Sequence, residues 1–246
     1  MALLEEFERQ GQYLFKHRGA LPLLIITIGI AAFWDSVYSS FWLSNPWLDR
    51  PYEIGCLSVS VLGIIIRSIA VGYSQKNTSG RNTTKQIADS VNKTGLYSVV
   101  RHPLYLANFC MWLGVALLTR NAWFILFFVI LFWVYYERIM FAEEQFLRRK
   151  FGEVYEAWAA KTPAFVPKLQ QWRSSGTTFN VKKVMLQEKN GVLATSILFL
   201  LFEEMEQFVK NGSLLLQENI WYFIFLATLL FYLIVKFISK RTLLLR

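Results

Sequence analysis

The chain has 246 residues, of which 54% are hydrophobic, 17% aromatic and only 17% charged. This composition is too apolar for an ordinary soluble domain of this length, so it indicates a membrane protein. The net charge of +9 does not call for nucleic acid, because a basic face also suits anionic lipid headgroups. The two cysteines, Cys56 and Cys110, lie in apolar stretches and support neither a disulfide framework nor a metal site.

The first 20 residues mix acidic and basic side chains, and no small-residue cleavage pattern follows the first apolar stretch. We therefore expect that stretch to remain as a spanning helix and not to be a removable signal peptide. A helix of about 20 apolar residues crosses the ~30 Å hydrocarbon core of a bilayer. Stretches that can form such helices are 21–43, 54–73, 104–118 with its flanks, 123–141 and 220–237.

A further apolar stretch, 192–209, is interrupted by Glu203, Glu204 and Glu206. A spanning helix, a buried helix and an interfacial helix would all have this pattern. The sequence thus predicts an all-α, polytopic helical membrane protein with five or six transmembrane helices and a cytoplasmic amphipathic helix.

Basic residues are distributed unevenly about these stretches. If all six span, the 26 Lys and Arg residues fall on one side of the membrane except for Arg50, Arg67, Arg120 and Lys210. The positive-inside rule makes that side cytoplasmic, and both termini lie on it. We expect a bacterial inner membrane, with the endoplasmic reticulum membrane as the alternative.

The segment 74–92 is rich in Asn, Thr, Ser and Gly and is typical of an exposed connector. We expect one short helix in it, over 85–91. A loop of this length in a compact protein is often a lid or a binding segment.

After the fourth span, apolar residues recur at steps of three and four, which predicts an amphipathic helix. Gly152 is its weak point and Pro163 ends it. A flexible junction is expected at 174–178. The chain then divides into 1–53 with the first transmembrane helix, a membrane core over 54–168, and a helical extension over 169–246.

Polar residues gather where the third apolar stretch begins. Pro103 suits the first turn of a helix, so Arg101 and His102 lie beside free backbone N–H groups, which attract anions. The spacing alone leaves a membrane flank and a binding site equally open. The other polar members of this cluster are Tyr97, Tyr105 and Asn108.

Three carboxylates follow in and after the fourth span. Glu143 lies four residues before Leu147, hence on the apolar stripe, where a carboxylate needs a cation. Glu144 can pair with Arg148 at i, i+4, which is a solvated arrangement that needs no function. Glu137 lies seven residues before Glu144, on the same side of a continuous helix, and an ionisable group at that depth is a functional candidate.

Arg67 is the basic residue inside a predicted span. A direct pair with Asp35 is not expected, because at ~1.5 Å per residue the two lie at different depths. Arg67 either reaches the interface or points into a cytoplasmic pocket, and the sequence favours neither.

Two segments together resemble a known family. The residues that carry the resemblance are Gly95, Tyr97, Arg101, His102, Pro103 and Tyr105, then Glu143, Glu144, Leu147, Phe151, Gly152, Tyr155, Pro163 and Pro167. In this order they are similar to the isoprenylcysteine carboxyl methyltransferase and phospholipid methyltransferase superfamily of multispanning membrane enzymes. The resemblance covers roughly 54–168, whereas the long polar loop and the last two helices lie outside the family core.

The resemblance implies S-adenosylmethionine as cofactor and a site at the cytoplasmic ends of the helices, where a lipid can arrive sideways. The residues assigned to cofactor binding are Tyr97, Arg101, His102, Tyr105, Asn108, Glu143 and Glu144. Arg101, Glu143 and Glu137 are assigned catalytic roles. The sulfonium, amino acid and adenine of this cofactor would need carboxylate, cationic and aromatic partners together.

Two other functions stay open at this point. One is a sterol or isoprenoid reductase that uses NADPH, whose phosphates would be poorly served by a carboxylate at Glu143. The other is a non-enzymatic membrane scaffold or transporter. For a methyltransferase, the acceptor is expected to be a membrane lipid or a lipidated molecule, and the added loop and helices favour a lipid headgroup over an isoprenylcysteine.

Overall fold

The computed structural model describes residues 2–38, 46–74, 86–212 and 219–241. Within these ranges the chain is helical and connected by loops, with α-helices and two 3₁₀ turns. In chain order the elements are α1 (Leu3–Lys16), α2 (Ala20–Tyr38), α3 (Pro46–Gly72), η1 (Leu96–Ser98), α4 (Pro103–Leu118), α5 (Ala122–Phe151), α6 (Glu153–Ala159), η2 (Leu169–Gln171), α7 (Val181–Asn211) and α8 (Ile220–Arg241).

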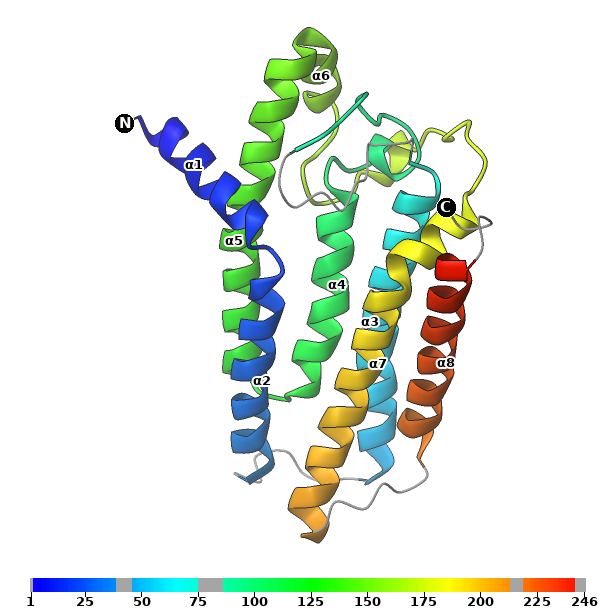
Figure 1. Ribbon diagram of the computed structural model, residues 1–246. Coiled ribbons are helices and arrows are strands. Elements are labelled where there is room, and N and C mark those ends of the chain that lie inside the picture. Colours follow the sequence, from blue (N-terminus) through cyan, green and yellow to red (C-terminus); the bar gives the residue numbers. More distant parts are fainter. Residues whose placement is uncertain (1, 39–45, 75–85, 213–218, 242–246) are drawn as a thin grey trace.

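The long helices run side by side in one bundle (Figure 1). Helices α3 and α4 pack together, as do α7 and α8, and α7 also contacts α3. At one end of the bundle lie α1, α6, the loops before α4 and the C-terminal end of α8 (Figure 1). The cytoplasmic position that the basic residues predict for this end stays a prediction.

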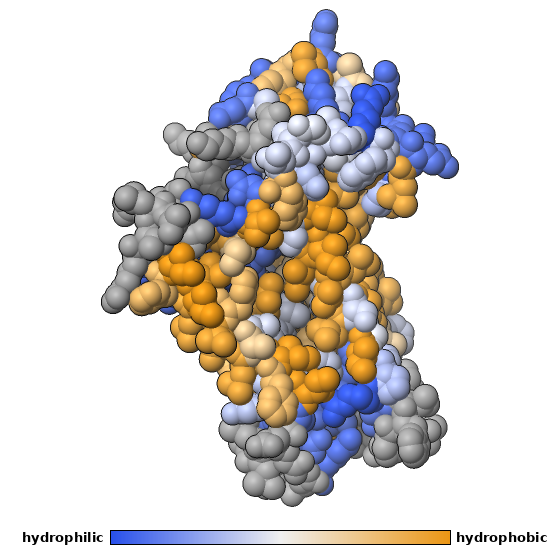
Figure 2. Space-filling view, turned by 90° about the vertical axis from the view of Figure 1, so that its right-hand side faces the viewer, coloured by the Kyte–Doolittle hydropathy of each residue, from blue (hydrophilic) through white to orange (hydrophobic). Residues whose placement is uncertain are grey.

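The outer surface of the bundle is apolar. In the described residues, α2, α3, α5 and α8 are long and apolar enough to cross a membrane, and α4 is a shorter apolar helix. Phe223, Leu230 and Phe237 of α8 are all exposed. Figure 2 shows an apolar band between two more hydrophilic ends of the molecule. The protein is therefore an all-α integral membrane protein, while the exact number of spans, and whether α7 is one, stays a prediction.

Each predicted apolar stretch overlaps a helix, and several of the helices extend beyond the apolar pattern. Helix α7 begins at Val181, well before 192, and α5 continues to Phe151. The part of the first stretch beyond Tyr38 lies outside the described residues. Gly152 ends α5 with a φ of 51° and separates it from α6, so the predicted amphipathic helix is two helices and not one.

The short helix predicted over 85–91 is wrong for the described residues, because 86–91 has no helical structure. A tertiary contact explains this: the Nζ of Lys150 on α5 donates a hydrogen bond to the carbonyl of Ala88. That carbonyl is bonded to another part of the fold and not to its own helix.

The predicted flexible junction at 174–178 is bonded to the core. The hydroxyl of Thr177 donates to the carbonyl of Tyr73 at 3.0 Å, and the N–H of Asn180 donates to the carbonyl of Gly72 at 3.0 Å. These bonds hold the start of α7 against the end of α3. The division of the chain into three parts stays a prediction, but its third part packs closely on the second.

Two glycines allow α3 and α4 to approach closely. A Cβ added at Gly114 would meet the backbone carbonyl of Cys56 and the hydroxyl of Ser60, and one at Gly63 would meet the backbone of α4. Small residues at such crossings are typical of membrane helix packing. The hydroxyl of Ser60 donates to the carbonyl of Met111 at 2.9 Å across this contact.

We expect Gly114→Ala to destabilise the protein by about 1 to 3 kcal/mol, because overpacking forces the helices apart. Gly55→Ala on α3 is the matched control, since nothing lies within 4 Å of its added Cβ. The control should be neutral or more stable by about 0.5 to 1 kcal/mol, the usual gain of alanine over glycine within a helix. Thermal unfolding in detergent compares the two, and equal stability of both variants would contradict the close approach.

Helix α1 is attached to α5 by an ion pair. Both guanidinium Nη atoms of Arg149 donate to the carboxylate of Glu8, at 2.9 and 2.5 Å. The hydroxyl of Tyr135 also donates to the carbonyl of Leu14 at 3.1 Å. The hydrogen bond from Arg149 holds the pKa of Glu8 below its ordinary value of 4.5.

This lowered pKa predicts that the attachment of α1 depends on pH. A carboxyl with a lowered pKa stabilises the attached state fully above its ordinary pKa and loses that contribution as the pH falls through the lowered value. A spin label at the exposed Tyr13 should therefore become more mobile in acid. Glu8→Gln should show this mobility at neutral pH also, whereas Glu5→Gln should behave as the wild type does.

Candidate active site

The segment before α4 is held by the segment after α6. The N–H of Arg101 donates to the carbonyl of Pro163 at 2.8 Å, and the N–H of Lys168 donates to the carbonyl of Val99 at 2.9 Å. Pro103 occupies the first turn of α4, as its sequence position predicts. The two segments that carry the family resemblance are therefore hydrogen-bonded to each other.

His102 lies between two consecutive carboxylates of α5. Its Nε2 is 2.9 Å from Oε1 of Glu144, and its Nδ1 is 3.8 Å from Oε2 of Glu143. The hydroxyl of Tyr105 donates to Oε1 of Glu143 at 2.7 Å, and Nε of Arg101 is 3.2 Å from Oε1 of Glu144. The side chain of His102 is only 7% exposed, so this network is fixed inside the protein.

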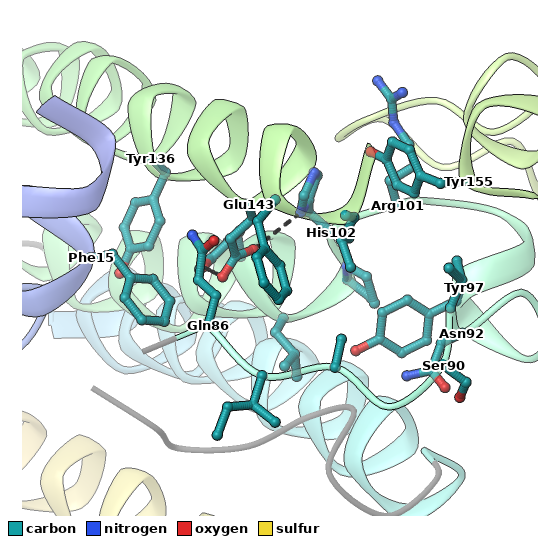
Figure 3. Close-up of a pocket in the computed structure, with 18 of the residues that line it drawn as sticks. Phe15, Gln86, Ser90, Asn92, Tyr97, Arg101, His102, Tyr136, Glu143 and Tyr155 are labelled. Atoms are coloured by element: carbon teal, nitrogen blue, oxygen red, sulfur yellow. Dashed lines mark hydrogen bonds and ion pairs between the residues drawn. The ribbon is translucent and has the colours of Figure 1, made fainter. Parts of the chain in front are cut away.

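A cavity of about 370 Å³ opens beside this network (Figure 3). Its size is in the range of small-molecule sites. Several separate parts of the fold contribute to its wall: the end of α1, the loop 86–92 with η1, one end of each of α3, α4 and α5, then α6, and the first turns of α7. The lining residues include Phe15, Arg18, Arg67, Gln86, Asn92, Tyr97, Arg101, His102, Tyr105, Asn108, Tyr136, Glu143, Tyr155, Trp158 and Gln187.

Aromatic rings form one wall of the cavity. The ring of Tyr105 is 4.9 Å from that of Tyr136, centroid to centroid, and is stacked on the ring of His102 at 5.8 Å. The hydroxyl of Tyr97 points toward the same space (Figure 3). Burial, together with the charge of Glu143, raises the pKa of Tyr97 well above its ordinary value, so its hydroxyl stays protonated.

Arg67 of α3 adds a cation to the cavity wall. It lines the cavity, and its Nη1 donates to Oδ1 of Asn108 at 2.5 Å. Its Nε pairs with Glu188 of α7 at 2.7 Å. Of the two sequence interpretations of Arg67, the structure thus favours the pocket.

Most of the residues predicted for the site come together here. Tyr97, Arg101, His102, Tyr105, Asn108 and Glu143 all line the cavity, whereas Glu144 lies behind His102 and Arg101 and does not. The predicted pairing of Glu144 with Arg148 is wrong, because Arg148 pairs with Glu156 of α6 at 3.3 Å. The break at Gly152 turns α6 back toward α5 and makes this other pair.

Glu137 lies outside the site. Its carboxylate pairs with the adjacent Arg138 at 3.1 Å, and its side chain is 48% exposed. The adjacent Tyr136 lines the cavity but Glu137 does not, because consecutive residues of a helix point in directions about 100° apart. The geometry gives no support to the catalytic role predicted for Glu137.

Sequence reasoning missed several lining residues. Tyr136 could have been found, because it lies seven residues before Glu143 and hence on the same helix face. Phe15, Gln86 and Gln187 come from segments far away in the chain. Gln86 lies in the polar segment 74–92, whose length indicates a lid or a binding segment, whereas no local pattern marks Phe15 or Gln187.

The comparisons with known proteins agree with this arrangement. The family model described as phospholipid methyltransferase matches residues 52–154, which contain both carboxylates and the segment Arg101 to Tyr105. A protein-S-isoprenylcysteine O-methyltransferase of Schizosaccharomyces pombe is 31% identical over 47% of this chain and 50% of its own length. Over less than half of its length, the chain is thus similar to membrane methyltransferases.

Two further relatives have different names. A nickel-cobalt-cadmium resistance protein of Alcaligenes xylosoxydans xylosoxydans is 27% identical over 67% of this chain and 71% of the relative. A cobalt-zinc-cadmium resistance protein of Cupriavidus metallidurans is 28% identical over 67% and 70%. In the described ranges, no group of three or more His, Cys, Asp or Glu side chains is placed to hold a metal ion. No solved structure matches the chain.

Proposed function

We propose that this protein is a membrane methyltransferase that binds S-adenosylmethionine in the cavity beside His102 and transfers its methyl group to a lipid or lipidated acceptor. The observation that carries the proposal is the carboxylate of Glu143, fixed by Tyr105 and His102 at the wall of an aromatic cavity. The names of the isoprenylcysteine methyltransferase relatives support the same reaction.

The residues present suit this cofactor. Glu143 offers a negative charge for a sulfonium or an ammonium, Arg67 and Arg101 offer positive charges for a carboxylate, and Tyr97 and Tyr105 offer aromatic faces. The cofactor would supply an electrophilic methyl group on its sulfonium. NADPH suits the cavity less well, because its phosphates would meet the charge of Glu143.

The contribution of the protein to catalysis is positioning and exclusion of water. Methyl transfer is a single in-line displacement, so holding the two reactants in place supplies much of the acceleration. The network of Arg101, His102 and Glu144 fixes the backbone and side chains around Glu143. The buried rings of Tyr105 and Tyr136 keep water from the wall on which the reaction would take place.

Titration calorimetry in nanodiscs tests the proposal. We expect S-adenosylmethionine and its demethylated product to bind, and NADPH to compete poorly with either. Absence of binding of both to folded protein would refute the methyltransferase function, and preferential binding of NADPH would favour a reductase.

For the acceptor we retain a lipid headgroup in preference to an isoprenylcysteine. Two parts of the chain that carry none of the residues of the family resemblance reach the cavity. The loop does so through Gln86 and Asn92, and α7, which lies beyond the matched residues 52–154, does so through Gln187. They would give the acceptor end of the cavity a shape of its own. The site would face the cytoplasm, with both termini on that side, and a bacterial inner membrane is the proposed location.

Radiolabelled methyl donor identifies the acceptor. Purified protein is incubated with a total membrane lipid extract and, separately, with a farnesylcysteine analogue. Label in lipid supports the preference, and label only in the farnesylcysteine product overturns it.

A further inference from the structure

Three helices meet at the guanidinium of Arg67. Arg67 itself is on α3, its Nη1 donates to Asn108 of α4 at 2.5 Å, and its Nε donates to Oε2 of Glu188 of α7 at 2.7 Å. Glu188 lies outside the matched family region 52–154, so α7 adds a charged contact that the family model does not include.

The ion pair is well buried. The side chains of Arg67 and Glu188 are 18% and 6% exposed. Burying two charges is expensive, and apolar residues of similar volume often stabilise a fold equally well or better. Stability alone therefore does not account for an ion pair here, and ionisable groups inside a membrane bundle usually serve a site.

The guanidinium of Arg67 has N–H donors that the described residues do not use. A guanidinium carries five N–H groups in a planar fork that matches the oxygens of a carboxylate or phosphate. The described partners of Arg67 occupy Nε and Nη1, and none of the described residues accepts a hydrogen bond from Nη2. Since Arg67 lines the cavity, its free donors are available to a ligand.

We propose that Glu188 is a positioning residue that orients Arg67 so that its guanidinium binds an acidic group of a ligand in the cavity. The inference rests on the proposed function and adds a cationic end to the site, opposite in charge to Glu143. The acidic group is a carboxylate or phosphate, and it belongs either to the amino acid part of the methyl donor or to the acceptor. Helix α7 is then part of the active site and not a separate extension.

The two sources are separated by two binding measurements. The first compares S-adenosylhomocysteine with its analogue that lacks the carboxylate. The second measures inorganic phosphate and the farnesylcysteine analogue on protein saturated with S-adenosylhomocysteine. The variants are Arg67→Gln, Arg67→Lys, Glu188→Gln and the double variant Arg67→Gln/Glu188→Gln. Glu206→Gln, at the other end of α7 and paired with Lys210, is the control.

We expect Arg67→Gln to weaken binding of the acidic ligand about 10- to 100-fold, as for a lost hydrogen bond between charged groups. Arg67→Lys, which keeps the charge without the fork, should fold and lose less. Glu188→Gln should weaken binding of the same ligand, and it should add nothing when Arg67 is already glutamine, because it acts through Arg67. If the variants lose affinity for S-adenosylhomocysteine but not for its decarboxylated analogue, the acidic group belongs to the methyl donor. If affinity is lost only in the second measurement, the acidic group belongs to the acceptor.

The inference is overturned if the variants bind all probes as the wild type does, or if the ligand with and the ligand without the acidic group lose affinity equally. Equal losses would mean that the pair serves the structure only. Failure of the wild type to bind S-adenosylhomocysteine would instead refute the proposed function, and the inference with it.

Discussion

Glu143→Gln is expected to lower the affinity for S-adenosylmethionine about 10- to 100-fold while the fold is retained. A hydrogen bond or contact with a charged group contributes roughly 1.5 to 3 kcal/mol, and every ~1.4 kcal/mol is a factor of ten in affinity. The amide oxygen of glutamine can still accept the hydrogen bond from Tyr105, which now donates to Oε1 at 2.7 Å. Only the negative charge at the cavity wall is removed. Calorimetric titration of the purified variant measures the change.

Glu137→Gln is the matched control, because it makes the same change two turns away on the same helix. Its carboxylate is half-exposed and pairs with Arg138, outside the cavity. We expect wild-type affinity from this variant. An equal loss in both variants would mean that the charge of the helix, and not the position of Glu143, governs binding.

The fold was largely predictable because it is determined mainly by apolar stretches, which are local features of the sequence. Apolar stretches long enough for a membrane lie on α2, α3, α5 and α8, and a shorter one lies on α4, since the bilayer requires a helix wherever the backbone enters it. The lengths were less predictable. Helix α7 begins 11 residues before the apolar run, because its first turns are held by contacts to α3 that no periodicity reveals.

The core of the site was predictable from spacing and from the resemblance. Arg101 and His102 directly precede α4, Tyr105 lies on its first turn, and Glu143 and Glu144 are consecutive on α5. Their local geometry therefore follows from where the two helices lie in the sequence. Which side chain of α4 contacts which side chain of α5 cannot be read from the sequence in this way. Which carboxylate faces the cavity and which lies behind His102 depends on the rotation of α5 against α4.

Errors occurred where a tertiary contact competes with a local one. Lys150 takes the carbonyl of Ala88, and the segment 86–91 is not helical. The turn at Gly152 gives Arg148 a partner in Glu156, which leaves Glu144 to Arg101 and His102. In each case a contact four residues along the chain was expected from the sequence, and the structure has a contact with a distant segment instead.

Glu144→Gln is expected to destabilise the protein by about 1 to 3 kcal/mol, in contrast to the small effect that a solvated pair with Arg148 would predict. The carboxylate of Glu144 is the partner of both Arg101 at 3.2 Å and His102 at 2.9 Å, and these three side chains are at most 20% exposed. Removing the charge leaves the guanidinium of Arg101 without its counterion at a buried position. Thermal unfolding in detergent should show a midpoint several degrees lower.

Arg148→Ala decides between the two pairings of Glu144. The ion pair of Arg148 with Glu156 joins two side chains that are each about half exposed, and such pairs contribute at most ~1 kcal/mol. Its loss should leave the unfolding midpoint nearly unchanged. If Arg148→Ala lowers the midpoint as much as Glu144→Gln does, and the double variant is no worse than either, then Glu144 pairs with Arg148 after all. If instead the double variant Arg101→Ala/Glu144→Gln is less destabilised than the sum of its single changes, the buried network of Arg101, His102 and Glu144 is the structure that holds α4 against α5 at the site.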